Sequence, residues 1–548
     1  MADHHEQMRQ SITADSGWLK GLNPAMAIWS KFVVFALVIF GAVWTKAAGE
    51  AFTAVKDWMV VVLKWYYLGI VAMFLFFVLW LLISRYGNVR LGDDDERHEF
   101  SYFSWFAMLF GAGMGIGLVF WSIAEPIYHF QSNPFIGEGT GIDPKSAQAA
   151  QVAMRITFFH WGLHPWAIYV VVGLTLSYFA YRKKLPLAIR SALYPLIGDR
   201  IYGPWGHAAD ILAVFGTVFG VATSLGLGVQ QMATGLHELT GIGFFVTVDD
   251  AGKQSPNISA MLMLIAIISA IATVSVVSGV GKGVKLLSEL NLWLSLAIMV
   301  FFLAFGPTRY LLNAFLQNTG DYLGAVIPLS LWSDANKDGP WQGWWTVFYW
   351  GWWIAWAPFV GMFIARISRG RTIREFVLGV LLVPTILAFI WLTLFGNTAL
   401  HIELFGAGGI AEAVKTDLTS ALYVTFDKMD LGLLGTLAAT VATLLIATYF
   451  ITSSDSGTLV VSTLLSVGDP HPPTVHRVIW GLSEGLVAAV LLLAGGLKAL
   501  QTASITAALP FSVIMLFMCF GLVKALREEV PGPQFVPGGE PTKPAPGE

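Results

Sequence analysis

Residues 341–368 read WQGWWTVFYWGWWIAWAPFVGMFIARIS. This run is long enough to cross a bilayer as a helix, because about 20 apolar residues suffice. It is also rich in tryptophan, and Gly351, Pro358 and Gly361 interrupt it. Glycine and proline are the usual causes of a helix kink. We therefore interpret the run as a broken membrane helix.

Two groups of tryptophan follow one another along this run. The first group, which we assign to the interfacial aromatic belt, is Trp341, Trp344 and Trp345. The second group, Trp352, Trp353 and Trp356, lies about 15 Å further along the helix, near the middle of the hydrocarbon core. A wall of indole faces at that depth suits a cation without hydrogen-bond donors, such as a quaternary ammonium group. Plain packing between helices is the alternative.

The composition identifies an integral membrane protein. Of 548 residues, 56% are hydrophobic and 12% are charged, against about 25% charged in soluble domains. The net charge of -3 does not favour a nucleic acid partner. The single cysteine, Cys519, excludes an intramolecular disulfide. The sequence has no nucleotide-binding loop of the Gly-x-x-x-x-Gly-Lys-Ser/Thr type and no assembled catalytic group, which disfavours an ATP-driven pump and an enzyme.

Hydropathy predicts an all-α fold with about twelve transmembrane helices. The expected spans lie near residues 25–46, 64–84, 103–130, 148–180, 206–236, 258–280, 288–307, 341–366, 374–398, 430–466, 474–497 and 501–524. Most of the 32 Lys and Arg residues then fall on the side of the N-terminus. The positive-inside rule therefore predicts a multi-pass protein of the plasma (inner) membrane with both termini cytoplasmic.

The spans divide the chain into six segments. They are a cytoplasmic N-terminal segment (1–24), two peripheral helices (25–84), a first five-span half (103–307), an interfacial helix (308–333), a second five-span half (341–524) and a short disordered C-terminal tail (525–548). Span 3 carries four glycines within residues 111–117, and spans 3 and 8 enter from opposite sides. Two broken helices at matching places indicate inverted repeats of a secondary transporter. Tight packing of small residues is the alternative.

Polar residues inside two other spans are further candidates. Span 10 carries the run Thr452-Ser453-Ser454-Asp455-Ser456, whose oxygens suit a small cation such as sodium if they face an unwound span 3. Hydroxyls that bond their own helix carbonyls are the alternative. For Asp455 we prefer a structural acceptor to a proton carrier. In span 3, Glu125 precedes Pro126 and is interpreted as a helix-end group.

Span 4 brings aromatic residues and histidines together. Trp161, Trp166 and Tyr169 fit one aromatic pocket if Pro165 distorts the helix. His160 and His164 are four residues apart and have the spacing of metal ligands. Because the sequence shows no third ligand, we prefer hydrogen-bonded histidines, and we expect no metal beyond sodium.

Five motifs together resemble the betaine/carnitine/choline transporter family. They are GMGIG at 113–117, HWGLHPWAIY at 160–169, WGWWIAWAPFVG at 350–361, RISRGRTIRE at 366–375 and TSSDSG at 452–457. The resemblance implies a fold of the leucine-transporter type, with repeats formed by spans 3–7 and 8–12. It also implies a homotrimer and transport of a small substrate without an organic cofactor.

The resemblance also assigns roles to individual residues. The implied aromatic box around a trimethylammonium group is Trp161, Trp166, Tyr169 and Trp353, with Trp352, Trp356 and Met114 along the substrate path. The implied sodium ligands are the carbonyls of Gly111, Met114 and Tyr449 and the hydroxyls of Thr452 and Ser453. Phe359 matches a position linked to a second sodium ion, and Asp455 is grouped with it as a possible second-ion or gating residue.

Gly117 determines the expected subtype. Proton-coupled choline carriers of the family tend to have Asp there, whereas sodium-coupled betaine carriers have Gly. The resemblance thus favours sodium symport of glycine betaine or dimethylsulfoniopropionate. Proton-coupled choline uptake and carnitine-type exchange remain alternatives within the class, and a membrane sensor or channel remains the alternative from another class. The short acidic tail differs from the long basic tail of osmosensing members, so we expect little osmotic activation.

Overall fold

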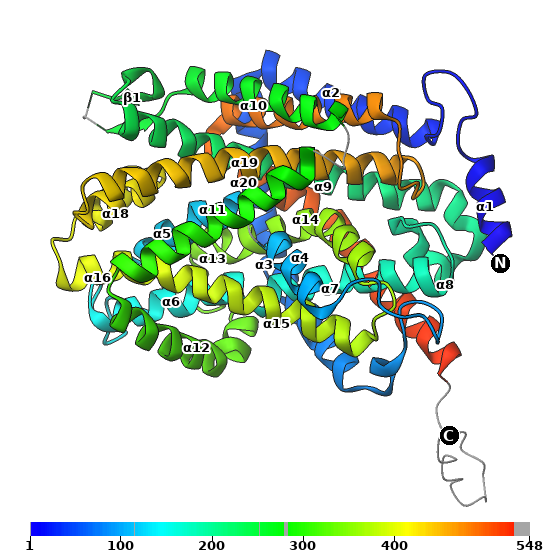
Figure 1. Ribbon diagram of the computed structural model, residues 1–548, viewed down its shortest axis with the longest axis horizontal. Coiled ribbons are helices and arrows are strands. Elements are labelled where there is room, and N and C mark those ends of the chain that lie inside the picture. The colour runs from blue at the N-terminus through cyan, green and yellow to red at the C-terminus, as the bar shows by residue number, and fades with distance from the viewer. Residues whose placement is uncertain (1, 114, 251–252, 279–282, 531–548) are drawn as a thin grey trace, which may run out of the picture.

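The computed structural model describes residues 2–113, 115–250, 253–278 and 283–530, which form a helical bundle (Figure 1). The long helices are α1 (Ala2–Ser11), α2 (Pro24–Val43), α3 (Thr45–Ile83), α4 (Tyr102–Gly113), α5 (Ile116–Gln131), α6 (Ala147–Trp161), α7 (Leu163–Ser177), α9 (Pro204–Thr240), α10 (Ile258–Ser278), α11 (Gly283–Phe305), α12 (Thr308–Leu331), α14 (Thr346–Ile367), α15 (Ile373–Leu392), α19 (Leu433–Leu465) and α20 (Thr474–Glu529).

Short elements connect these helices. They are η1 (Arg85–Asn88), η2 (Tyr178–Arg182), η3 (Ile189–Leu193), α8 (Tyr194–Ile197), η4 (Gly198–Tyr202), η5 (Gly243–Phe245), α13 (Trp341–Trp344), η6 (Thr393–Asn397), α16 (Thr398–Phe405), α17 (Ile410–Thr416), η7 (Leu418–Ser420) and α18 (Ala421–Lys428). The strands β1 (Val246–Val248) and β2 (Gln254–Pro256) form an antiparallel pair in which Thr247 lies opposite Ser255. This pair lies at the periphery of the bundle in Figure 1.

Within the described ranges, ten helical segments are long and apolar enough to cross a membrane. The expected twelve spans differ from this count at two breaks. The third expected span is divided into α4, which ends at Gly113, and α5, which begins at Ile116. The last two expected spans are joined in α20, where Gly496 has a left-handed backbone with φ of 56° and bends the helix. A residue with a Cβ adopts that conformation only at a steric cost, which explains why a glycine stands here.

The expected break in span 8 is wrong, because α14 is continuous from Thr346 to Ile367. Its glycines serve close packing instead. A Cβ on Gly351 would lie 2.9 Å from the Cα of Ile505 in α20, and one on Gly361 would lie 2.6 Å from Cγ1 of Val172 in α7. The interruption in this part of the chain lies at Trp345, between α13 and α14.

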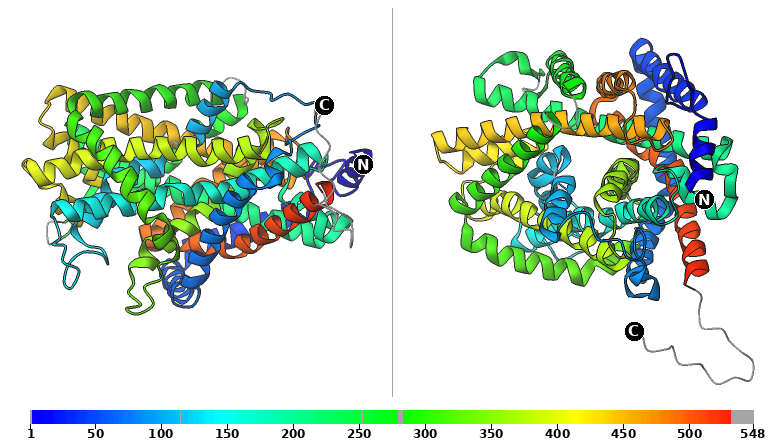
Figure 2. Two further views of the ribbon diagram at one scale, coloured as in Figure 1. Left: turned by 90° about the horizontal axis from the view of Figure 1, so that it is seen from below. Right: turned by 45° about the vertical axis from the view of Figure 1, so that its right-hand side comes forward.

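The packing places α14 inside the bundle. It contacts α7, α20 and α9, while α19 packs on α9 and α11. The helices α10 and α12 lie at opposite edges of the bundle in Figure 1. The N-terminus and the last turn of α20 lie at the same end of the molecule, which Figure 2 shows from two further directions. The expected interfacial helix 308–333 corresponds to α12.

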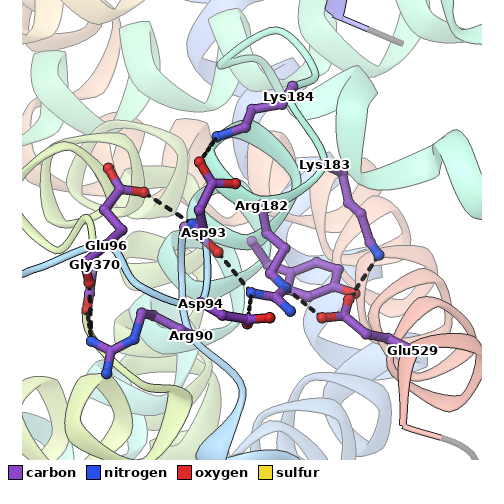
Figure 3. Close-up of polar contacts among 11 residues, drawn as sticks. Arg90, Asp93, Asp94, Glu96, Arg182, Lys183, Lys184, Gly370 and Glu529 are labelled. Carbon is purple, nitrogen blue, oxygen red and sulfur yellow. Dashed lines mark hydrogen bonds and ion pairs between the residues drawn. The ribbon is translucent and has the colours of Figure 1, made fainter.

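Charged side chains join three loops to the end of α20 (Figure 3). Arg182 bonds both Glu529 and Asp94, and Lys183 Nζ lies 2.7 Å from Glu529 Oε2. The hydrogen bond from Arg182 lowers the pKa of the Asp94 carboxyl. These contacts stabilise the last turn of α20, which ends at Glu529, so the helix continues through residues 525–529, where the disordered tail was expected. The part of that tail at 531–548 lies outside the described residues.

Glu529→Gln tests this anchor. We expect the midpoint of thermal unfolding to fall by roughly 2–4 °C, because Arg182 and Lys183 lose a largely buried anionic partner. The matched control is Glu528→Gln, which changes an exposed neighbouring carboxylate. A melting curve of the purified protein in detergent measures both variants. Equal midpoints for the two variants would show that the ion pairs do not stabilise the end of α20.

Candidate functional site

An aromatic cavity lies where α5, α6, α7, α9, α14 and α15 meet. Its lining residues are Gly115, Gly117, Leu118, Trp161, Pro165, Trp166, Tyr169, Ser224, Trp352, Trp353, Trp356 and Ala388. The structure thus brings together all six aromatic residues that the sequence placed around or near a substrate. Met114, the remaining predicted substrate contact, lies outside the described residues.

The break between α6 and α7 directs Trp161 into this cavity. The α6 helix ends at Trp161, and Gly162 has φ of -89° and ψ of -132°, which is not helical. The freed backbone N–H of Leu163 donates to the Tyr322 hydroxyl at 3.0 Å. The expected distortion at Pro165 is therefore wrong in position: Pro165 lies in the first turn of α7, where a proline costs no backbone hydrogen bond.

The rings of the cavity pack around Trp353. Its ring centroid lies 4.8 Å from that of Trp352 in a stacked pair and 4.9 Å from that of Trp161 in a T-shaped pair. Tyr169 meets Trp353 edge-on at 6.4 Å and Trp166 at 5.3 Å. All five rings are buried. The indole and phenol faces that border this space favour a cation without hydrogen-bond donors.

Two glycines bring neighbouring helices against these indoles. A Cβ on Gly117 of α5 would lie only 2.2 Å from Cη2 of Trp352. A Cβ on Gly220 of α9 would lie 2.4 Å from Cδ1 of Trp356. Side chains at either position would displace the rings. The sequence predicted that glycines of span 3 allow close approach, and Gly117 does so for the Trp352 indole.

Gly117→Ala tests the contact with Trp352. The added methyl group overpacks the indole, so we expect a shift of the tryptophan emission maximum and a loss of about 1–3 kcal/mol of stability. Gly69→Ala is the matched control, because a Cβ on Gly69 of α3 meets no atom within 4 Å. Fluorescence spectra and melting curves of both variants provide the measurement. If both variants behave like the wild type, the indole is not held by Gly117.

A buried polar network adjoins the cavity. The carboxylate of Glu125 accepts a hydrogen bond from Trp161 Nε1 at 2.8 Å and from the Tyr349 hydroxyl at 2.5 Å. His160 Nδ1 lies 2.6 Å from its other oxygen. The interpretation of Glu125 as a helix-end group is therefore wrong: its side chain is fully buried inside α5. The sequence missed this role because the partners come from α6 and α14.

The same network decides the roles of the histidines and of Trp345. His160 Nε2 lies 3.0 Å from Thr346 Oγ1, and His164 Nε2 lies 2.7 Å from Ser330 Oγ. Both histidines are thus hydrogen-bonded, as preferred, but the expectation that no third ligand exists is wrong for His160, because ligand atoms of Glu125, His129 and His160 lie within 4.8 Å of one another. Trp345 was assigned to the interfacial belt, and this is wrong: it is 5% exposed, and its ring centroid lies 4.4 Å from that of His129. Trp344, in contrast, is 47% exposed.

The polar run of α19 faces α10 and α11. Asn291 Nδ2 donates to Thr452 Oγ1 at 2.9 Å, and the Ser295 hydroxyl lies 2.7 Å from that of Tyr449. Asp455 accepts a hydrogen bond from Ser275 at 2.6 Å, as expected of a structural acceptor. Asn291 and Ser295 are polar partners that the sequence reasoning missed. Their spacing of four residues in an apolar helix is the signal that could have indicated them.

The predicted sodium ligands are only partly described. The Thr452 hydroxyl donates to the Tyr449 carbonyl oxygen of its own helix at 3.2 Å, which places these two oxygens side by side. Ser453 is half-buried on the same helix. Gly111 is exposed near the end of α4, and Met114 lies outside the described residues. Phe359 is half-buried against Trp356, at 5.3 Å between ring centroids. The sodium site stays a prediction.

The comparison with known families matches this architecture to one family over nearly the whole chain. Residues 25–531 match the family described as BCCT, the betaine/carnitine/choline family transporters. The chain belongs to the BCCT family. Its members are transporters rather than enzymes, which agrees with the helices that can cross a membrane and with the apolar composition.

Relatives of this BCCT chain carry names of two substrate types. A probable glycine betaine transporter of Desulfitobacterium hafniense is 49% identical over 85% of this chain and 90% of that protein. The glycine betaine transporter OpuD of Bacillus subtilis is 44% identical over 85% of this chain and 87% of that protein. The osmo-dependent choline transporter BetT2 of Acinetobacter baylyi is 42% identical over 93% of this chain and 72% of that protein.

Proposed function

We propose that this BCCT protein is a sodium-coupled symporter that imports a betaine-like zwitterion by alternating access. The aromatic cavity carries the proposal. Five buried rings surround one space, and the indole nitrogens of Trp352 and Trp356 have no hydrogen-bond partner among the described residues. A trimethylammonium or dimethylsulfonium group fits such a wall because it offers positive charge and no donors. Glycine betaine and dimethylsulfoniopropionate both meet this requirement.

Gly117 supports a substrate that brings its own carboxylate. A choline carrier of the kind expected from the family would have Asp at this position, but Trp352 fills the space of any Cβ there. The names of the D. hafniense and B. subtilis relatives support glycine betaine. Choline is the second candidate, because the A. baylyi relative is named a choline transporter.

For the coupling ion we propose sodium, bound between the broken third span and α19. The support is the proximity of the Tyr449 carbonyl and the Thr452 hydroxyl, which are hard oxygen ligands. The ligands from Gly111, Met114 and Ser453 complete the proposed set. For Phe359 and Asp455 we propose a role in binding a second ion or in gating. In a membrane helix the hydroxyls otherwise bond to their own carbonyls, as Thr452 does here with Thr448 at 3.1 Å.

The proposed membrane arrangement follows the family. The chain would cross the plasma membrane twelve times, with α4 and α5 as the broken third span and the two halves of α20 as the last two spans. Spans 3–7 and 8–12 would form the inverted repeats, and both termini would be cytoplasmic. The proximity of the N-terminus to the end of α20 supports termini on one side (Figure 1). A homotrimer is part of the same proposal.

Trp353→Ala is the direct test of the substrate site. Loss of the ring removes the face and edge contacts at the centre of the cavity, and we expect the affinity for glycine betaine to fall at least about tenfold. Trp344→Ala is the control, since Trp344 is exposed and outside the cavity; it should change affinity by at most about twofold. Radiolabelled uptake into proteoliposomes measures both. Equal losses of affinity in the two variants would show that the cavity is not the substrate site.

The ion gradient tests the coupling. Uptake in proteoliposomes should require an inward sodium gradient and should persist when the proton gradient is collapsed. Thr452→Ala should raise the sodium concentration that gives half-maximal uptake, because one hydroxyl ligand is lost. Uptake driven by protons alone would instead support the choline type, and exchange without a gradient would support the carnitine type.

A further inference from the structure

Glu125 is a buried acid that the proposed transport cycle does not use. Its side chain is fully buried, on α5. Both oxygens are engaged: one lies 2.6 Å from His160 Nδ1, and the other accepts from Trp161 and Tyr349. Trp161 is also a wall of the aromatic cavity. The carboxylate is thus separated from the cavity by a single indole ring.

The donors around Glu125 are those of an anion. The indole N–H of Trp161 can only donate, and the Tyr349 hydroxyl points its proton at the same oxygen, so Glu125 Oε2 serves as an acceptor twice. A carboxylate that accepts several hydrogen bonds is stabilised in its charged form. The two fixed donors on Oε2, with the His160 ring against the other oxygen, therefore form a cradle that favours negative charge.

No permanent positive charge balances this carboxylate among the described residues. Only His129 and His160 lie within ion-pair distance of it. Neither nitrogen of His129 has a hydrogen-bond partner, and the nearer one lies 3.6 Å from Glu125. A buried imidazolium that makes no hydrogen bond would be costly, so we treat His129 as neutral. His160 bonds Thr346 with its other nitrogen, which a neutral ring can do.

We propose that Glu125 is the buried counter-charge of the aromatic cavity, acting through the Trp161 indole to make the site prefer a cation over an uncharged group of equal shape. The carboxylate polarises the indole N–H that it binds, which raises the electron density of the ring that faces the substrate. Its own charge adds a direct attraction that water does not screen in a buried site. This inference rests on the proposed function of the cavity. It adds a fixed negative charge to the ring faces as a source of attraction for the substrate cation.

Matched ligands separate charge from shape. Glycine betaine and 3,3-dimethylbutyrate have the same outline and the same carboxylate, and differ in a central N⁺ or C. Choline and 3,3-dimethylbutanol form a second such pair. For each pair, the ratio of the two affinities measures how strongly the site prefers the cation. A change in packing alone weakens both members alike and leaves the ratio unchanged.

Glu125→Gln removes the charge and keeps the hydrogen bonds. The amide oxygen can accept from Trp161 and Tyr349, and the amide N–H can donate to His160 Nδ1 when the His160 ring carries its proton on Nε2. We expect the affinity for glycine betaine to fall at least tenfold while that for 3,3-dimethylbutyrate is unchanged, measured by isothermal titration calorimetry on the full-length protein. Glu125→Met, which has a similar volume and no charge, serves as the second variant if the glutamine variant does not fold.

Two further variants are controls. Tyr349→Phe removes one donor from the carboxylate but keeps the carboxylate itself, and it should lower the preference for glycine betaine over its carbon isostere less than Glu125→Gln does. Asp321→Asn removes a different acid. Asp321 lies on α12 and accepts a hydrogen bond from Gln151, and its loss should leave the ratio of the two affinities unchanged. If Tyr349→Phe lowers the ratio as much as Glu125→Gln does, the effect comes from ring position and the proposal is overturned.

The outcomes distinguish this inference from the proposed function. A wild-type protein that binds glycine betaine but keeps its ratio in both Glu125 variants contradicts the counter-charge alone. A wild-type protein that ignores betaine but binds choline, with a ratio that falls in the variants, contradicts the proposed substrate and supports the counter-charge. Equal wild-type affinities for a cation and its carbon isostere overturn the counter-charge without any variant.

Discussion

The aromatic cavity depends on Gly117 of α5, against which the Trp352 indole of α14 packs. With a Cβ at that position only 2.2 Å from Trp352, the indole could not occupy its present place. Trp352 in turn stacks on Trp353, which is the centre of the ring cluster. Gly220 allows the same approach of α9 to Trp356. The missing side chains on two helices thus create the room that the tryptophans of a third helix fill.

The cavity also depends on polar contacts behind its rings, which fix the orientation of the indoles. Trp161 donates to Glu125, and Trp353 Nε1 donates to the carbonyl of His160 at 3.1 Å. These bonds hold two indoles at a fixed angle before any substrate arrives. Ring faces that are already in position need no ordering on binding, which favours affinity. The Glu125 carboxylate, which is one of these polar groups, provides the fixed negative charge that we infer for the site.

Much of this arrangement was predictable from the sequence, and the remainder depends on distant segments. The depth of Trp352 and Trp353 along an apolar run indicated a cavity rather than an interfacial belt. The same rule failed for Trp345, because His129 of α5 covers it and no local pattern reports that contact. The continuity of α14 was missed because glycine in a helix has two explanations, and only the packing against Ile505 shows that close approach is the relevant one. The role of Glu125 was missed because its partners come from α6 and α14, which are distant in sequence.

The central claim is that the tryptophan cavity binds a betaine-like zwitterion together with sodium. Titration of the intrinsic tryptophan fluorescence of the wild-type protein tests it most directly, because the binding groups are themselves the fluorophores. Glycine betaine, dimethylsulfoniopropionate, choline and carnitine would each be titrated in sodium and in potassium buffers. The account predicts saturable quenching by a zwitterion in sodium and little change in potassium. Quenching that is identical in both buffers, or no response to any of the four ligands, would contradict it.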